Sequence, residues 1–383
     1  MDFPRAPRVL GRYSSDLPGP LLILVAGIHG NEPSGVEAVR IVLAALEERR
    51  PRLRGRLLAL TGNIEALVRG VRYVDRDLNR IWNAGAVDTE RERVHEETEK
   101  QALLAEIEPA LAEVQGERVL LLDLHSTSAE GAPFGIMSDT LQNRPVALAL
   151  EVPVVLGLEE TIAGTLLEYF GERGHVAFCL EGGQHADVMT TVHHEAAIWI
   201  LLVTSAMLAE EDAPDFEEKR ALLRRAGGGL PRFVEIRHRH AVPGAEPFVM
   251  EPGFRHFQRV EEGQLLARGG DDGECEVLAP FGGFLVMPRY QGLGDDGFFL
   301  GREVRRVWLW LSTVLRRLRL ARVLPLLPGI RRHPEHRGWL VADPRIARWF
   351  TTEIFHLLGY RRAEPLGRKL VFVRRLEGPE ARW

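Results

Sequence analysis

The chain has 383 residues, of which 45% are hydrophobic and 27% charged, with a net charge of -5. This composition is typical of a folded globular protein with room for one large domain and a smaller one. A membrane-spanning helix is not expected, because no apolar run reaches the ~18 to 20 residues that such a helix needs. Residues 1–20 lack the apolar core of a secretory signal, and two cysteines, Cys179 and Cys275, cannot build a disulfide framework. We therefore expect a cytoplasmic location.

The first two hundred residues alternate short apolar runs with helical patterns, which is typical of an α/β domain. Strands are predicted over residues 21–26, 56–60, 119–124, 152–156 and 176–180. Helices are predicted over residues 33–49, 89–114, 161–172 and 190–208. We expect residues 1–209 to form a catalytic α/β domain with a mixed sheet. The charged and then glycine-rich stretch 210–229 is interpreted as a linker.

A different pattern follows, with short apolar runs between glycine and proline turns. Residues 232–287 predict short strands, as in a small β-sandwich or barrel. We expect residues 230–300 to form this β domain.

The last segment, residues 301–383, is strongly basic. It holds 19 Lys+Arg and 7 Asp+Glu, a balance of +12, which leaves -17 for residues 1–300. We expect a basic helical C-terminal extension that begins with an amphipathic helix over residues 303–324. Docking on the acidic body of the same chain, or on a second subunit, is the favoured interpretation. An acidic partner and an interfacial membrane helix remain open, and nucleic acid is not favoured.

Three residues could bind a metal ion. His29 and Glu32 follow the apolar run 21–26, and His125 follows the run 119–124. Ligands bind at such strand ends in open α/β sheets. If the two strands are neighbours, two imidazoles and one carboxylate form a zinc site with a fourth position open for water, as in catalytic sites. A single His-x-x-Glu match is weak evidence, so the prediction depends on this spatial convergence.

Further charged residues lie at similar points of the chain. Arg72 could stabilise the oxyanion that forms when water adds to a carbonyl, and Asn79 with Arg80 could bind a substrate carboxylate. Asp77 or Asp123 could hold a zinc-bound imidazole in its orientation. Glu181, at the end of the run 176–180, has the position and type of a general base.

The motifs occur in the order His29-Gly-Asn-Glu32, Asp77-Leu-Asn-Arg80, Asp123-Leu-His-Ser-Thr127 and a late strand-end glutamate, Glu181. Together they resemble the succinylglutamate desuccinylase/aspartoacylase family of the zinc carboxypeptidase superfamily. The resemblance covers residues 20–300, with specific motifs only in the first two hundred. Residues beyond 301 lie outside the family pattern.

The resemblance implies a role for each matching position. It makes His29, Glu32 and His125 the ligands of one Zn²⁺ per chain. It makes Arg72 the group that polarises the carbonyl and Glu181 the general base and acid. It assigns the substrate carboxylate to Asn79 and Arg80. It also implies that the β domain covers the site and contributes a tyrosine, for which Tyr290 is the candidate.

The predicted function is that of a zinc-dependent amidohydrolase. We expect it to remove the acyl group from an N-acyl amino acid or a similar small amide through zinc-activated water. One alternative is a metallocarboxypeptidase acting on peptide C-termini, and an ester hydrolase would use the same chemistry. A zinc-containing binding or scaffold protein with vestigial activity is the alternative from a different class.

Overall fold

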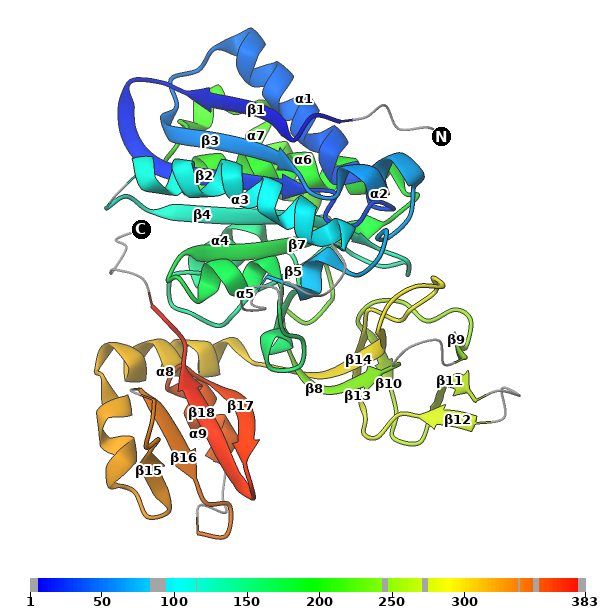
Figure 1. Ribbon diagram of the computed structural model, residues 1–383, viewed down its shortest axis with the longest axis vertical. Helices are drawn as coiled ribbons and strands as arrows, with labels where there is room; N and C mark the ends of the chain where they lie inside the picture. Colours follow the sequence, from blue (N-terminus) through cyan, green and yellow to red (C-terminus); the bar gives the residue numbers. More distant parts are fainter. Residues whose placement is uncertain are drawn as a thin grey trace.

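The computed structural model of the chain describes residues 6–82, 94–114, 116–242, 247–270, 275–336, 338–346 and 351–377. Figure 1 shows three parts of the molecule. We call the α/β part that ends at residue 226 the body, residues 233–303 the β part, and the residues from 306 onward the C-terminal extension, which lies beside the body. The predicted fold class, an α/β domain with a mixed sheet followed by a β part, is confirmed. None of the described helices combines the length and the apolar composition that a membrane crossing requires.

One sheet of eleven strands runs through the body and the β part in the order β1-β3-β2-β4-β7-β5-β6-β8-β14-β13-β10. Its strands in the body are β1 (Val9–Ser14), β2 (Leu17–Ala26), β3 (Arg54–Thr61), β4 (Val119–Thr127), β5 (Phe134–Ile136), β6 (Val154–Leu156) and β7 (Val176–Gln184). Strands β3, β2, β4 and β7 are mutually parallel, whereas β1 and β5 run antiparallel to β3 and β7. The carboxyl ends of the four parallel strands therefore meet at one edge of the sheet.

Helices cover both faces of this sheet (Figure 1). They are α1 (Ser34–Arg49), α2 (Ile64–Arg69), α3 (His95–Glu113), α4 (Arg144–Leu150), α5 (Leu166–Gly171), α6 (Val188–Thr204) and α7 (Phe216–Ala226). Three short 3₁₀ turns accompany them, η1 (Leu78–Arg80), η2 (Leu158–Glu160) and η3 (Glu210–Asp212).

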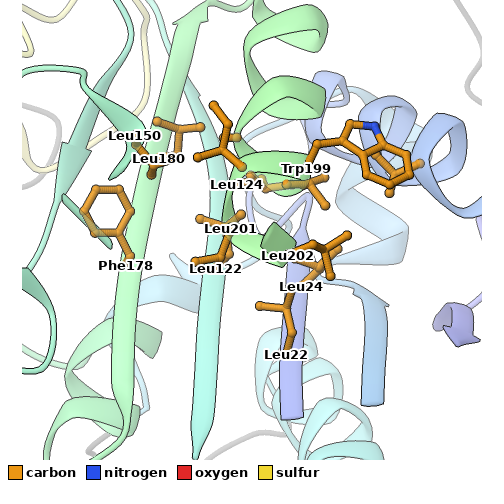
Figure 2. Close-up of a cluster of buried hydrophobic side chains, with 14 of the residues drawn as sticks. Leu22, Leu24, Leu122, Leu124, Leu150, Phe178, Leu180, Trp199, Leu201 and Leu202 are labelled. Carbon is orange, nitrogen blue, oxygen red and sulfur yellow. The ribbon is translucent and has the colours of Figure 1, made fainter. Parts of the chain in front are cut away.

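The core explains why the parallel strands are continuous apolar runs. In β2, Leu22 and Leu24 pack with Trp199 of α6 on one face of the sheet (Figure 2). Leu21 and Ile23 belong to the cluster on the other face, which includes side chains of α3 and α5. Successive residues of a strand point to opposite faces, so a strand covered on both sides is apolar throughout.

Two predictions for the body need correction. The stretch 210–229 is not a plain linker, because α7 occupies most of it and buries Phe216 and Leu223 against the core. Most residues of α7 are charged, so its two buried apolar side chains gave too weak a pattern to predict the helix. The helix expected over 161–172 begins only at Leu166, since Gly164 has a φ of +75° and Thr165 caps α5. The start of the helix expected over 89–114 lies partly outside the described residues.

The β part contains β8 (Phe233–Ala241), β9 (Phe248–Met250), β10 (Gln258–Val260), β11 (Leu265–Gly269), β12 (Cys275–Leu278), β13 (Gly283–Val286) and β14 (Asp296–Glu303). Strand β8 pairs in parallel with β6, so the large sheet continues from the body into this part. Strands β9, β11 and β12 form a separate three-stranded sheet. A small core that includes Leu266, Leu285 and Phe298 joins the two sheets.

The C-terminal extension is not a helical tail. It comprises α8 (Arg306–Arg317), η4 (Leu320–Leu326), β15 (Ile330–Arg332), β16 (Trp339–Ala342), α9 (Thr351–Leu357), β17 (Tyr360–Leu366) and β18 (Lys369–Arg374). The strands form an antiparallel sheet in the order β15-β16-β18-β17. Phe355 and Phe372 stack at 3.9 Å in its own core. The helix expected over 303–324 ends near Arg317, because Arg319 adopts a left-handed conformation with a φ of 55°.

The extension docks on the acidic body of its own chain, as the charge distribution indicated. Arg375 lies 2.9 Å from Glu159 and 3.0 Å from Glu160, which belong to η2. Arg316 of α8 lies 2.7 Å from Asp139. The two arginine side chains are each only 5% exposed, so these are buried ion pairs.

Candidate metal centre

The first part of the site is the turn between β2 and α1. Gly27, with a φ of +72°, turns the chain sharply after Ala26. At Gly30 a Cβ would lie 2.0 Å from the carbonyl carbon of Ala66, so only glycine fits there. This close approach places His29 and Glu32 together at the edge of the sheet.

His125 reaches the same edge from β4. Strand β4 pairs in parallel with β2 on one side and with β7 on the other, where His125 lies opposite Glu181 in register. Strands β2 and β4 are therefore neighbours, as the predicted metal site required.

The three predicted ligands converge. Glu32 Oε1 lies 3.0 Å from His29 Nδ1, and Glu32 Oε2 lies 3.0 Å from His125 Nδ1. One ligand atom from each residue lies within 4.8 Å of the others. All three residues are at most 4% exposed. Two imidazoles and one carboxylate arranged in this way could hold a metal ion.

A carboxylate holds the far side of each imidazole. Asp77 Oδ1 lies 3.0 Å from His29 Nε2, and Asp123 Oδ2 lies 2.9 Å from His125 Nε2. In metal sites such contacts fix the tautomer and direct the opposite nitrogen toward the ion. Burial alone would raise the pKa of Asp77, but His29 and Arg72 together hold this pKa well below its ordinary value.

Arg72 joins the cluster from the loop after α2. Its Nη2 donates to Asp77 Oδ2 at 3.0 Å, and its Nη1 lies 3.5 Å from Glu32 Oε1. The loop is held by Glu96, a fully buried residue of α3 that the sequence analysis missed. Its carboxylate accepts hydrogen bonds from the backbone N–H groups of Val74, Asp75 and Arg76. No local pattern reveals this role, because Glu96 lies twenty residues or more away along the chain.

Glu181 ends the apolar part of β7 beside the three ligands. It is only 5% exposed, and its Oε2 has no hydrogen-bond partner among the described residues. Burial raises the pKa of Glu181 to about 8; His125 acts against this rise, and the nearby Glu32 carboxylate adds to it. An unpartnered buried carboxyl group of this kind is a candidate for proton transfer.

The surrounding pocket is closed partly by the β part. Its lining includes His29, His125 and Glu181, and also Pro288 and Asp296 from the segment that leads into β14. The wall formed by the body includes Glu159 of η2 and Thr165 before α5. Residues far apart in the sequence therefore shape the space in front of the three ligands.

Asn79 and Arg80 both line this pocket. Asn79 Oδ1 accepts a hydrogen bond from the backbone N–H of Leu166 at 2.8 Å. Arg80 Nη2 donates to Asp296 Oδ2 at 3.0 Å, while the buried Arg80 Nε has no partner among the residues described. Asp296, which the sequence analysis missed, also binds Arg239.

Tyr290 does not reach the pocket. Its hydroxyl donates to the carbonyl of Glu251 at 2.8 Å and accepts from the N–H of Phe254 at 2.9 Å. These bonds hold the ring on the β part. The neighbouring Gln291 lines the pocket instead, and its Oε1 accepts from Asn31 Nδ2 at 3.1 Å.

Four buried carboxyl groups surround the centre, those of Glu32, Asp77, Asp123 and Glu181, and Arg72 donates to Asp77 among them. Burial alone would lower the pKa of His125, but Asp123 and Glu32 raise it well above its ordinary value, so without an ion this imidazole holds a proton beside the carboxylates. Like charges held close together in a buried site are costly. A divalent cation bound by His29, Glu32 and His125 would take the place of the proton on the imidazole, so the residues present fit such an ion.

Residues 18–205 match the family model described as the succinylglutamate desuccinylase/aspartoacylase catalytic domain. Succinylglutamate desuccinylase of Pseudomonas fluorescens (strain SBW25) is 32% identical over 105 residues, which are 27% of this chain and 30% of that protein. The enzyme of the same name from P. fluorescens (strain Pf-5) is 44% identical over 62 residues, 16% of this chain and 18% of that protein. The chain thus matches less than a third of these relatives' length.

Two solved structures share the fold over a larger part of the chain. A succinylglutamate desuccinylase/aspartoacylase from Rhodobacter sphaeroides aligns with a TM-score of 0.56 at 20% identity, covering 75% of this chain and 87% of that one. The product-bound ectoine utilization protein EutE from Ruegeria pomeroyi aligns with a TM-score of 0.55 at 20% identity, covering 78% and 97%.

Proposed function

Because residues 18–205 belong to the succinylglutamate desuccinylase/aspartoacylase family, we propose that the chain is a zinc-dependent amidohydrolase. Its substrate is an N-acyl amino acid or a similar small amide with a carboxylate, and the acyl group is removed by hydrolysis. One observation carries the proposal. His29, Glu32, His125 and Glu181 meet at one edge of the sheet, with Glu181 buried and without a hydrogen-bond partner among the described residues.

The donor set supports zinc as the ion. Two imidazoles and one carboxylate are a common set for catalytic zinc, and three protein ligands leave a coordination position open. When bound, zinc supplies Lewis acidity and lowers the pKa of water to about 7. Asp77 and Asp123 hold the imidazoles so that both Nδ1 atoms face the Glu32 carboxylate, where the ion would be bound.

Glu181 moves the proton in this mechanism. As a base it takes a proton from the attacking water, and as an acid it passes that proton to the departing amine. Burial raises the pKa of Glu181 to about 8 in the chain without a metal ion. A cation held by His29, Glu32 and His125 would lower this pKa, so that the carboxylate form needed for the first step would be accessible near neutral pH.

Arg72 and the pair Asn79 and Arg80 act on the substrate. Arg72 is fixed by Asp77 at 3.0 Å, and a fixed guanidinium beside the metal ligands can stabilise the oxyanion without reorganising during the reaction. Arg80 is held by Asp296, and its Nε has no partner among the described residues. A substrate carboxylate is a suitable acceptor for this group. The hydroxyl of Tyr290 lies outside the pocket, so we assign it a structural role.

A metallocarboxypeptidase would use the same residues on a peptide C-terminus. The segment that includes Pro288 and Asp296 contributes to the pocket wall, and this closure favours small substrates over long peptides. A scaffold protein with vestigial activity would have no use for a buried, unpartnered Glu181.

The test is metal quantification followed by a substrate screen. The purified chain should contain one zinc per molecule and hydrolyse at least one of a panel of N-acetyl, N-succinyl and N-formyl amino acids. Peptides with free C-termini, assayed in parallel, should be cleaved more slowly. Faster cleavage of peptides would favour the carboxypeptidase, and a metal-free, inactive chain would contradict the proposal.

A further inference from the structure

Helix α8 presents its apolar side outward. Val307, Trp310, Val314 and Leu318 follow at steps of three and four residues, so they share one face of the helix. Val307 is 59% exposed, and Trp310 and Leu318 are each 65% exposed. Val314 is half-buried.

The opposite side of α8 faces the protein and carries polar side chains beside Leu309 and Leu315, which pack against the cores of the body and of the extension. Ser312 and Arg316 are buried there, and Thr313 lies beside them. Arg144 of the body donates to the hydroxyls of Ser312 at 2.9 Å and Thr313 at 2.6 Å. Arg316 donates to Asp139 at 2.7 Å. Helix α8 therefore differs from an ordinary surface helix, because it leaves a second apolar stripe, with Val307, Trp310 and Leu318, facing outward.

Exposed apolar residues continue beyond the helix. In η4 and the residue after it, Val323 is 48% exposed, Leu326 82% and Leu327 45%. Side chains this exposed project from the surface. We call the exposed apolar residues of α8 and η4, together with Leu318 at the end of α8 and Leu327 after η4, the outer patch; its members are Val307, Trp308, Trp310, Leu318, Leu320, Val323, Leu326 and Leu327.

Arginines are interspersed along the segment that carries the outer patch, and its nearest acids in sequence are Glu303 and Glu335. Residues 304–334 contain eight arginines and neither aspartate nor glutamate. One of the eight, Arg316, is buried against Asp139, and the other seven are exposed. Exposed tryptophan and leucine side chains bordered by arginine are the composition of a helix that lies in the headgroup layer of a membrane.

We propose that the outer patch docks this protein on an anionic phospholipid surface. The lipid headgroups supply negative charge for the seven exposed arginines, and the hydrocarbon below them takes up the projecting Trp310 and Leu326 side chains. A fluid lipid layer needs no complementary groove for these side chains.

Charge argues against a second copy as the occupant. In a two-fold symmetric contact the same patch meets itself. The exposed arginines of both chains would then face one another, with no acid from residues 304–334 to separate them.

The test uses the full chain in vesicle flotation. Vesicles of phosphatidylcholine alone are compared with vesicles that also contain phosphatidylglycerol. Binding is expected only to the anionic vesicles, with a blue shift of tryptophan fluorescence and a loss of binding as salt is raised. The double variant Trp310→Glu/Leu326→Glu should reduce partitioning by about 10-fold or more, because each change removes a large apolar side chain from the contact.

The matched control is Val249→Glu, which changes an apolar residue that is 69% exposed on β9 of the β part. It should bind anionic vesicles like the unchanged chain. Sedimentation velocity of all variants completes the design. Absence of binding to anionic vesicles, or equal binding by the double variant, overturns the proposal. A dimer that the double variant abolishes would assign the patch to a second copy instead.

Discussion

Buried charge is arranged differently at the metal centre and at the contact between the body and the extension. At the centre, four carboxyl groups lie around two imidazoles and the Arg72 guanidinium, and Glu181 Oε2 has no hydrogen-bond partner among the described residues. At the contact, Asp139 is bonded to both Arg144 and Arg316, and Arg375 is bonded to both Glu159 and Glu160.

We interpret the paired charges at the contact as stabilising the fold and the carboxyl groups at the centre as serving a bound ion. Breaking a buried pair leaves an unpaired charge and is strongly destabilising. Two imidazoles and a carboxylate that converge beside a carboxyl group left without a partner among the described residues suit a cation from outside. Neutralising a carboxylate is therefore expected to destabilise the fold at the contact between body and extension, but not at Glu181 of the centre.

The largest effect is expected from His29→Ala. Loss of one imidazole leaves two protein ligands, so the purified chain should contain little or no zinc and lack amidase activity. Plasma emission spectrometry on the purified variant measures this. His336→Ala, at an exposed position of the extension, should keep its metal. A full zinc content in His29→Ala would place the metal elsewhere.

Glu181→Gln should retain zinc and lower kcat by about 10²-fold or more, because the base that moves the proton is lost. The substitution keeps the size of the side chain. Steady-state kinetics on the best N-acyl substrate, together with metal content, distinguish this outcome from loss of the site. Normal turnover would remove Glu181 from the mechanism.

Asp139→Asn should lower the free energy of unfolding by roughly 3–5 kcal/mol, since Arg144 and Arg316 lose a buried counter-charge. Glu181→Gln in the metal-free chain should not be destabilised, because burial already favours the neutral form of that carboxyl group. Urea unfolding of both variants makes the comparison directly. Similar losses in the two would erase the distinction between the two regions.

A smaller effect is expected on how the free energy of unfolding depends on pH. Burial alone would lower the pKa of His356, but Glu160 and Glu235 raise it to about 9. A folded-state pKa above the unfolded value of about 6.5 means that this stabilisation is complete below about pH 6.5. It declines as the pH rises toward 9, by roughly 3 kcal/mol at most. Unfolding measured from pH 6 to 9.5 should show this decline, and His356→Gln should flatten it.

The sequence predicted where the candidate metal ligands lie, because their positions depend on the order of apolar runs along the chain. His29, Glu32 and His125 directly follow apolar runs, and parallel buried strands bring such positions to one edge. The polar side of α8 could not be oriented in advance, because its partners Arg144 and Asp139 lie more than 160 residues away. The direction of the Tyr290 hydroxyl could not be predicted either, because the hydroxyl bonds to backbone groups of Glu251 and Phe254 in another loop.

Glu159 has a place in both regions. It lines the pocket, and its carboxylate is bonded to Arg375 at the end of the last strand. A substitution at position 159 that reshapes the pocket would therefore also weaken the attachment of the C-terminal extension. A redesign of this wall must give Arg375 a new partner, and residues 1–300 alone would lack the arginine that holds Glu159 in place.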